Sequence, residues 1–260
     1  MHSDRQELAG DALFSLEGKT ALVTGARTGI GRAIAVGLAK AGAELVLFGH
    51  RDNLEETRSL VAGAGRSCST AVADLSNPEE LEGPVEKVLS EHRVDVLVNN
   101  AGTISRSPAA EFPRESWDTV MDTNLNSLFF LTQRVARPML ERGAGKIINI
   151  ASLLSFQGGV NVPAYATSKH GVVGLTKALS NEWAPGGVQI NAIAPGYIAT
   201  NNTEALRRDP DRSAEILARI PAGRWGTPQD LSGAAVFLAS AAADYVSGHV
   251  LTVDGGWMAR

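Results

Sequence analysis

Short apolar runs alternate with amphipathic stretches along most of the chain. The apolar runs predict buried strands, and the stretches between them predict helices. The expected strands span residues 20–24, 44–48, 69–73, 94–98, 146–150, 188–193 and 250–253. The expected helices span residues 32–41, 54–62, 78–91, 116–140, 165–183 and 228–238. Strands that alternate with helices are typical of βαβ units, so the pattern predicts an α/β fold with a parallel sheet.

The length of the chain favours a single domain. With 260 residues and 44% hydrophobic content, it can bury a substantial core undivided, as α/β folds of this size commonly do. We expect residues 1–13 to be a flexible tail and residues 14–260 to form one domain. A polar insertion at about 200–224 is longer than most connections in compact domains, so we expect a substrate lid there.

Composition excludes several classes of function. A formal net charge of −4 without a basic run gives no general attraction to nucleic acid or to an anionic membrane, so any phosphate must be bound locally. The single cysteine, Cys68, cannot form an internal disulfide and is expected in the core of a protein from a reducing compartment. Residues 1–10 lack the apolar core of a signal peptide, which favours a cytoplasmic protein. The five histidines show no metal-ligand spacing, so no metal site is expected.

A glycine-rich turn follows the first expected strand. The run 20–24 leads into Gly25-Ala-Arg-Thr-Gly-Ile-Gly and then directly into a predicted helix. Glycines at this position let the backbone approach a pyrophosphate, and the amino end of the helix favours negative charge. The spacing is Gly-x-x-x-Gly-x-Gly, and the alternative is a tight turn that needs glycine only for packing.

Two further polar positions follow expected strands. Asn99-Asn100-Ala101-Gly102 comes after the run 94–98, where the amides can bond to backbone and the small residues leave room for a flat ring or a ribose. A plain asparagine-glycine turn is the alternative. Asp74 either accepts a hydrogen bond from an adenine amino group or caps the helix expected near Pro78.

Ser152, Tyr165 and Lys169 can meet around one reacting oxygen. Ser152 ends the apolar run after residue 146, so its hydroxyl should lie at the carboxyl end of a strand, where sites of open α/β sheets form. Tyr165 and Lys169 are four residues apart and would share one face of a helix. An ammonium group nearby favours phenolate and lowers the pKa of a tyrosine from about 10. The alternative is a packed aromatic ring beside a solvated lysine.

Together these motifs resemble the short-chain dehydrogenase/reductase family over nearly the whole chain. The residues that carry the resemblance are Thr24-Gly25-x-x-x-Gly29-x-Gly31, Asp74, Asn99-Asn100-Ala101-Gly102, Asn124, Ser152, Tyr165-x-x-x-Lys169 and Pro195-Gly196. The resemblance implies a Rossmann-type doubly wound parallel sheet of about seven strands with helices on both faces, a nicotinamide cofactor and a homotetramer.

The resemblance also implies roles for individual residues. Tyr165 would be the acid/base, Lys169 would lower its pKa and hold the ribose, Ser152 would polarise the carbonyl, and Asn124 would support a proton relay. The cofactor-binding positions that it implies are Gly25, Arg27, Thr28, Gly29, Ile30, Gly31, His50, Arg51, Asp74, Leu75, Asn100, Ala101, Gly102, Tyr165, Lys169, Pro195, Gly196, Ile198 and Thr200.

Within the family, the chain is similar to a branch of sugar-acid dehydrogenases that act on 2-deoxy-D-gluconate or 2-dehydro-3-deoxy-D-gluconate. The segments that carry this similarity are 14–19, 154–159 with 162–163, 194–203, 212–217, 220–226 and 254–257. The similarity implies an anionic substrate, and a guanidinium group matches a carboxylate bidentately. The predicted substrate contacts are Ser152, Gln157, Tyr165, Arg106 and Arg212.

The choice between NAD and NADP stays open in the sequence. Resemblance favours NAD, but Gly49 stands where NAD-preferring relatives commonly carry the acidic residue that bonds the ribose diol. His50 and Arg51, or Arg27 in the glycine turn, could instead meet a 2′-phosphate, which makes NADP admissible. Solvated surface arginines are the alternative for both positions.

The sequence therefore predicts an NAD(P)-dependent oxidoreductase that moves hydride between nicotinamide and a secondary alcohol or ketone of a deoxy sugar acid. A 3-oxoacyl thioester reductase or a polyol dehydrogenase of the same fold is the first alternative. The second is a non-catalytic nucleotide-sensing protein, since a fold alone does not determine function. The intact set of Ser152, Tyr165 and Lys169 argues against the second alternative.

Overall fold

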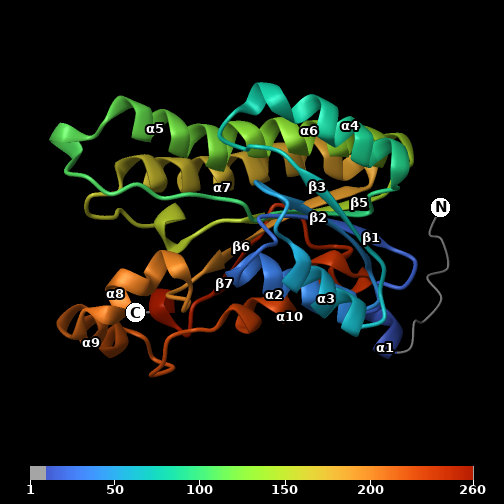
Figure 1. Cartoon of the computed structure of the whole chain (residues 1–260). Coiled ribbons are helices and arrows are strands. Elements are labelled where there is room, and N and C mark those ends of the chain that lie inside the picture. Colours follow the sequence, from blue (N-terminus) through green and yellow to red (C-terminus); the bar gives the residue numbers. More distant parts are fainter. Residues whose placement is uncertain (1–9, 260) are drawn as a thin grey trace.

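A computed structural model describes residues 10–259 and contains one seven-stranded sheet (Figure 1). All strand pairs are parallel, and the order is β3-β2-β1-β4-β5-β6-β7. The strands are β1 (Thr20–Thr24), β2 (Glu44–Gly49), β3 (Cys68–Val72), β4 (Val96–Asn99), β5 (Gly145–Ile150), β6 (Val188–Pro195) and β7 (Val250–Val253). From β1, the strands β2 and β3 extend the sheet toward one edge, and β4 to β7 extend it toward the other. The strand order therefore changes direction between β1 and β4, where ligands bind in such folds. The predicted doubly wound sheet is confirmed.

Helices cover both faces of the sheet (Figure 1). One layer contains α2 (Gly29–Lys40), α3 (Glu55–Gly63) and α10 (Ser232–Ala239). The other contains α4 (Glu82–Glu91), α5 (Arg114–Met121), α6 (Ser127–Glu141) and α7 (Pro163–Trp183). The described chain begins with the short helix α1 (Gly10–Leu13), and the rest of the expected tail, residues 1–9, lies outside the described residues.

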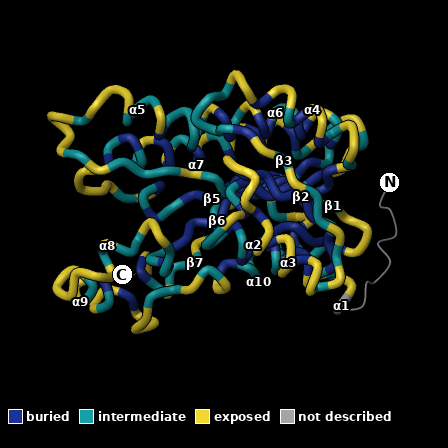
Figure 2. The backbone as a smooth tube through the Cα atoms, in the orientation of Figure 1, coloured by how far each residue is buried: buried dark blue, intermediate teal, exposed yellow. Residues whose placement is uncertain are grey.

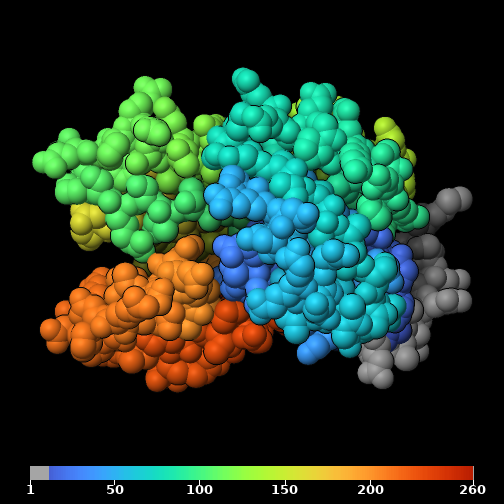
Figure 3. All heavy atoms as spheres, in the orientation of Figure 1, coloured from blue at the N-terminus to red at the C-terminus, as the bar shows by residue number. Residues whose placement is uncertain are grey.

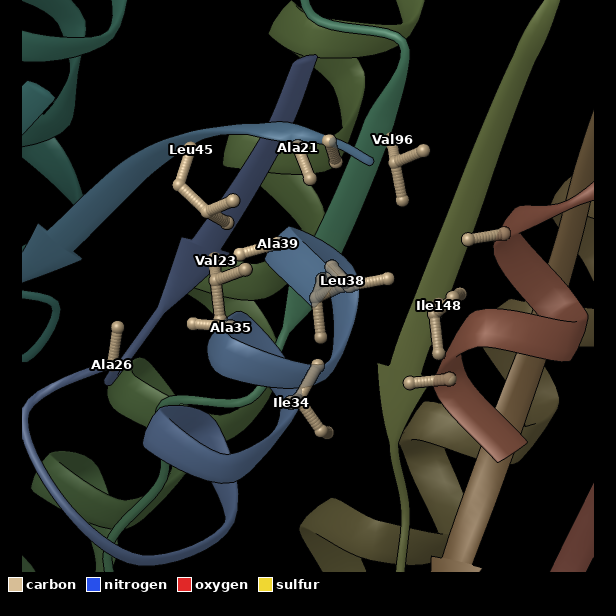
Figure 4. Close-up of a cluster of buried hydrophobic side chains, with 14 of the residues drawn as sticks. Ala21, Val23, Ala26, Ile34, Ala35, Leu38, Ala39, Leu45, Val96 and Ile148 are labelled. Carbon is tan, nitrogen blue, oxygen red and sulfur yellow. The ribbon is translucent and has the colours of Figure 1, made fainter. Parts of the chain in front are cut away.

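The core forms where these helices meet the strands. Figure 4 shows Ile34 and Leu38 of α2 pointing toward β1 and β5, where they belong to one buried cluster with Val23 and Ile148. Each of these side chains is at most 1% exposed, and burying such a side chain contributes about 1.5–3 kcal/mol. Figure 2 shows that the central strands are buried while much of α8, α9 and the outer loops is exposed. The carboxyl ends of the strands are therefore held on a rigid base.

The helix expected over residues 116–140 is divided in the structure. A π-helical turn, Asp122–Asn126, separates α5 from α6. A π turn widens the backbone by one residue, and such turns occur mostly at functional sites. A hydrophobic pattern does not reveal one extra residue inside a helix, which is why the sequence predicted an unbroken element.

The expected lid contains regular structure. A short turn (Asn201–Thr203) leads into α8 (Glu204–Arg208) and α9 (Pro210–Arg219). The side chain of Asp209 caps α9 by accepting a hydrogen bond from the backbone N–H of Arg212 at 3.0 Å. Asp followed by Pro at the first helical position is a helix-start signal, so this helix could have been predicted. Between residues 10 and 259, no helix is long and apolar enough to cross a membrane.

Candidate active site

The glycine turn joins β1 to α2 in a conformation that only small residues tolerate. Gly25 and Gly29 have φ angles of 64° and 56°, and a Cβ at Gly31 would lie 2.3 Å from the carbonyl oxygen of Gly25. The amide of Asn100 donates to the carbonyl oxygens of Thr24 at 3.0 Å and Gly25 at 3.2 Å. The first turn of α2 carries no acidic residue, so its amino end favours a bound anion.

Thr24 ties this turn to the next loop. Its hydroxyl donates to the carbonyl oxygen of Val98 and accepts from the backbone N–H groups of Asn100 and Ala101, each at 3.0 Å. The predicted bonding of asparagine to the backbone across the gap is therefore present. Thr24 was not predicted as a site residue, although its place at the end of a strand before the glycine turn was a usable signal.

Two cavities meet at the glycine turn. One of about 580 Å³ and one of about 460 Å³ share Gly25, Arg27, Thr28, Ala101 and Gly102. The larger is also lined by Phe48, Gly49, His50, Arg51, Asn53, Asp74, Leu75, Ser76, Thr103, Thr119 and Thr123. The smaller is also lined by Gly29, Ile30, Gly31, Asn100, Ile150, Ala151, Ser152, Tyr165, Lys169, Pro195, Gly196, Ile198, Thr200, Asn201, Asn202 and Thr203. A dinucleotide fits such a pair, because its pyrophosphate lies between its two nucleosides.

All the predicted cofactor-binding residues line one or both of these cavities. The sequence prediction missed Asn201, Asn202 and Thr203, which line the smaller cavity from the start of the lid. They lie in segment 194–203, which carries the similarity to sugar-acid dehydrogenases, and this was a usable signal.

The end of the larger cavity near β2 is polar. His50 lies 3.3 Å from Asp74, measured from Nδ1 to Oδ1, and Arg27 and Arg51 are both exposed. Burial disfavours the charged Asp74 carboxylate, but hydrogen bonds from Ser76 and the nearby His50 outweigh it and hold the pKa below its ordinary value. Asp74 thus closes a turn at Ser76 instead of capping the helical turn at Pro78, where no side-chain cap is present.

Ser152 and Tyr165 form the centre of the smaller cavity. Ser152 lies just after β5, and its hydroxyl accepts a hydrogen bond from the backbone N–H of Leu154 at 3.1 Å. Tyr165 lies in the first turn of α7, lines the same cavity as Ser152, and is close enough for the Ser152 hydroxyl to act on its pKa. The two hydroxyl groups are therefore together, as the sequence predicted.

The electrostatic setting of Tyr165 differs from the expectation. Burial raises the pKa of Tyr165, and the Ser152 hydroxyl and the charge of Arg106 only partly offset this. The Nζ of Lys169 donates to the carbonyl oxygen of Ile150 at 2.7 Å and lies 5.6 Å from the centre of the Tyr165 ring. Burial also lowers the pKa of Lys169 from 10.5 to about 8. The groups that lower the Tyr165 pKa here are Ser152 and Arg106, and the expected effect of Lys169 is not among them.

Asn124 lies in the π-helical turn and is almost fully buried. Its Oδ1 accepts from the backbone N–H of Thr103 at 2.8 Å, and its Nδ2 donates to the carbonyl oxygen of Thr103 at 2.9 Å and to Ser168 at 3.1 Å. A Cβ at Gly102 would lie 3.2 Å from Asn124 Oδ1 and 3.7 Å from Lys169 Nζ. The side chains of Asn124 and Lys169 therefore both lie beside Gly102.

The predicted substrate arginines lie in different settings. Arg106 donates through Nη2 to the carbonyl oxygen of Asn202 at 3.3 Å, and its charge acts on Tyr165. Arg212 pairs with Glu215 at 2.7 Å on α9. Neither arginine lines the two cavities, and Arg106 is the one whose charge acts on Tyr165. Figure 3 shows the region of α8 and α9 (orange) and the region of α5 (green) facing each other across a hollow. Only Arg106 is thus near the reacting groups.

Gln157 was also predicted to contact the substrate. Its backbone N–H donates to the carbonyl oxygen of Leu153 at 3.1 Å, in the turn that follows Ser152. Its side-chain oxygen accepts from the indole N–H of Trp257 at 3.3 Å. Gln157 lines neither of the two cavities and lies between the turn that follows Ser152 and Trp257.

Known proteins match this chain over nearly its whole length. A family model described as enoyl-(acyl carrier protein) reductase matches residues 25–258. A 2-dehydro-3-deoxy-D-gluconate 5-dehydrogenase of Bacillus subtilis is 57% identical over 247 residues, which are 95% of this chain and 97% of the relative.

Solved structures share the fold closely. A protein from Beutenbergia cavernae, described as an NAD(P)-dependent gluconate 5-dehydrogenase and crystallised with NADP, has a TM-score of 0.93 and 55% identity over 95% of this chain and 100% of its own. One from Agrobacterium tumefaciens, described as a 2-deoxy-D-gluconate 3-dehydrogenase with bound NADP, has a TM-score of 0.90 and 56% identity over 95% and 99%.

Proposed function

We propose that this chain, which belongs to the short-chain dehydrogenase/reductase family, oxidises or reduces a deoxy sugar acid with NAD(P)(H). The observation that carries the proposal is the pairing of Ser152 and Tyr165 in a cavity that is continuous with the glycine turn. An acid/base pair beside a dinucleotide-shaped cavity is the arrangement that hydride transfer requires.

The residues present fit the cofactor. The glycine turn and the amino end of α2 would hold the pyrophosphate, and Lys169 would hold the nicotinamide ribose. Support comes from the crowding at Gly31 and at Gly25, where an ideal Cβ would lie 2.9 Å from the Cα of Ala101. When bound, the nicotinamide ring supplies or accepts the hydride.

Side chains of the protein transfer the proton and stabilise the charge that develops on the reacting oxygen. Ser152 donates a hydrogen bond to the reacting oxygen of the substrate, and Tyr165 gives the proton to that oxygen or takes it away. Since burial raises the pKa of Tyr165, its resting state is the protonated phenol, which suits donation to a carbonyl oxygen. Lys169 keeps positive charge near the phenol, and Asn124 supports the path by which Tyr165 exchanges its proton with solvent.

The substrate class follows from the relatives and from Arg106. The relatives are named for gluconate and its deoxy and dehydro derivatives, all of which carry a carboxylate. Arg106 lies where its charge acts on Tyr165, so a carboxylate bound by it would lie close to the reacting groups. We assign Arg106 to the substrate carboxylate and give Arg212 no part in binding.

The assembly and location also belong to this proposal. We infer a homotetramer, the usual assembly in the family to which the chain belongs, and a cytoplasmic location, which suits the free thiol of Cys68. The mass of the protein in solution, measured by light scattering after gel filtration, tests the tetramer. A monomer at micromolar concentration would contradict it.

Absorbance at 340 nm tests the function. The purified enzyme is mixed with NAD or NADP and with 2-dehydro-3-deoxy-D-gluconate, 2-deoxy-D-gluconate or gluconate, each in its reactive redox direction. A 3-oxoacyl thioester with NADH or NADPH, and a polyol with NAD or NADP, serve as alternative substrates. We expect the highest kcat/KM with a deoxy sugar acid, and a clear preference for a thioester or a polyol would overturn the proposal.

A further inference from the structure

A hydrophobic cluster connects the lid to the carboxyl end of the chain. We call it the lid–tail cluster and define it as Leu153, Ile216, Ile220 and Trp257, with Tyr197, Leu206 and Trp225 packed against it. Its members come from the turn after Ser152, the loop after β6, the lid and the final turn of the described chain (Trp257–Ala259). Figure 1 shows the last described residues (red) beside α8 and α9.

Most of these residues come from the segments in which the chain is similar to sugar-acid dehydrogenases. Segments that are distant in sequence therefore converge on one packed unit next to the site. The cluster binds no cofactor by itself, because its four buried members line neither of the two cavities that meet at the glycine turn. Its effect on the reaction must pass through a residue that it holds in place.

Trp257 is fixed on several sides. Its side chain is 4% exposed, the guanidinium of Arg219 lies 4.0 Å from its ring centre, and the ring of Tyr197 lies 4.7 Å away. The carboxylate of Asp254 accepts from the backbone N–H groups of Gly256 and Met258, each at 2.8 Å, and holds the turn that carries Trp257. The indole N–H is thus held in one direction.

That N–H points to the side chain of Gln157. Trp257 Nε1 donates to Gln157 Oε1 at 3.3 Å. An indole nitrogen can only donate, so the amide oxygen of Gln157 must face it, and the two N–H donors of the amide point the other way. A sugar acid presents hydroxyl and carboxylate oxygens, which accept hydrogen bonds from such donors.

We propose that Trp257 is a positioning residue that fixes the amide orientation of Gln157, so that Gln157 offers donors to the oxygens of an acidic sugar substrate. This inference rests on the proposed function. Without the indole N–H, the amide can turn over and present its oxygen to the substrate, which would repel a carboxylate. Substrate binding should weaken, while cofactor binding and the proton transfer by Tyr165 stay as they are.

The test compares two conservative tryptophan variants. Trp257→Phe keeps an aromatic ring against Arg219 and Tyr197 but removes the donor. Trp183→Phe is the matched control, because Trp183 is also buried and donates to Glu182 at 3.1 Å, but belongs to a separate core cluster. We expect Trp257→Phe to raise KM for the sugar acid about three- to tenfold, with kcat and the Kd for NADPH unchanged. Trp183→Phe should leave KM as in the parent.

A double-variant cycle with Gln157→Ala tests the mechanism. If Trp257 acts through Gln157, the KM of Trp257→Phe/Gln157→Ala equals that of Gln157→Ala alone. Additive effects, or an unchanged KM in Trp257→Phe, would overturn the inference. If the parent itself turns over no sugar acid, the proposed function fails instead, so the two failures are distinguishable.

Gln157→Glu provides a test that does not depend on the folding of Trp257→Phe. Glutamate keeps an acceptor for the indole N–H but offers the substrate a negative charge in place of donors. Its KM for the sugar acid should exceed that of Gln157→Ala. Equal values would mean that the amide donors do not face the substrate, and this also overturns the inference.

Discussion

The ammonium group of Lys169 is held by the strand carbonyl of Ile150, with 2.7 Å between Nζ and the oxygen. Lys169 is 4% exposed, so its charge lies in a poorly solvated place and has one fixed partner on β5. This arrangement explains the lowered pKa of Lys169, since burial penalises the ammonium form. It also gives the residue a fixed position relative to Ser152, which follows the same strand.

Replacing Lys169 by methionine should change how stability depends on pH. The pKa of Lys169 is about 8 in the folded protein and 10.5 ordinarily, so between these values the unfolded chain binds a proton that the folded chain has released. The unfolding free energy of the parent therefore rises with pH across this interval, by up to about 3 kcal/mol from this group.

Methionine does not ionise, so Lys169→Met lacks this rise. Urea unfolding of both proteins at pH 7.5, 8.5 and 9.5 measures the difference. The unfolding free energy of Lys169→Met minus that of the parent should be largest at pH 7.5 and should decrease as the pH increases. A difference that stays constant with pH would mean that the folded lysine has an ordinary pKa.

Tyr165→Phe should fold and bind cofactor but lose about 10² to 10⁴ in turnover, because general acid/base catalysis contributes that much. The ring is retained, so packing in the first turn of α7 is preserved and only the hydroxyl is lost. Steady-state rates at 340 nm and the Kd for NADPH from fluorescence give the two readouts. Near-normal turnover would remove Tyr165 from the mechanism.

Replacing Arg106 or Arg212, the two arginines predicted from the sequence to bind substrate, should have different effects on KM. Arg106→Ala should raise KM for the sugar acid about tenfold to a hundredfold, the effect of losing a charge-assisted hydrogen bond. Arg212→Ala is the matched control, because Arg212 makes an exposed pair with Glu215 on α9, and such pairs contribute little. Equal KM values in both variants would show that Arg106 does not bind the carboxylate.

The sequence was sufficient for the sheet and for most of the site. Buried parallel strands read as apolar runs, and the residues at their carboxyl ends meet because parallel strands end at one edge. This is how Ser152, Asn100 and Asp74 could be placed at one edge of the sheet before their contacts were known. Arg106 and Arg212 could not be separated, because each lies in a polar segment and only the tertiary structure shows which one reaches Tyr165.

Properties set by long-range packing were beyond the sequence. The pKa of Lys169 depends on burial between α7 and β5, and the pattern Tyr-x-x-x-Lys says nothing about the carbonyl of Ile150. Asn124 in the π-helical turn forms hydrogen bonds with Thr103 and Ser168, which are distant in sequence. Local propensity contains none of this information.

The choice of cofactor gives the last prediction, and it concerns the end of β2. The strand ends at Gly49, one residue beyond the expected strand, and Gly49 contributes no carboxylate to repel a 2′-phosphate. His50 is engaged with Asp74 at 3.3 Å, so the exposed Arg51 is the more available cation at this end of the cavity. We expect NADPH to be used at least as well as NADH.

Gly49→Asp and Arg51→Ala should both shift the ratio of kcat/KM with NADPH to kcat/KM with NADH in favour of NADH. For Arg51→Ala the shift should be about tenfold or more, the effect of losing a charge-assisted bond. The aspartate also adds bulk, because a Cβ at residue 49 would lie 3.1 Å from the carbonyl oxygen of Arg51 and 3.2 Å from Leu54. Gly49→Ala therefore controls for crowding and should leave the ratio nearly unchanged. If neither Gly49→Asp nor Arg51→Ala moves the ratio, the phosphate is recognised elsewhere. Arg27 is then the residue to replace next, because it lines both cavities from the glycine turn.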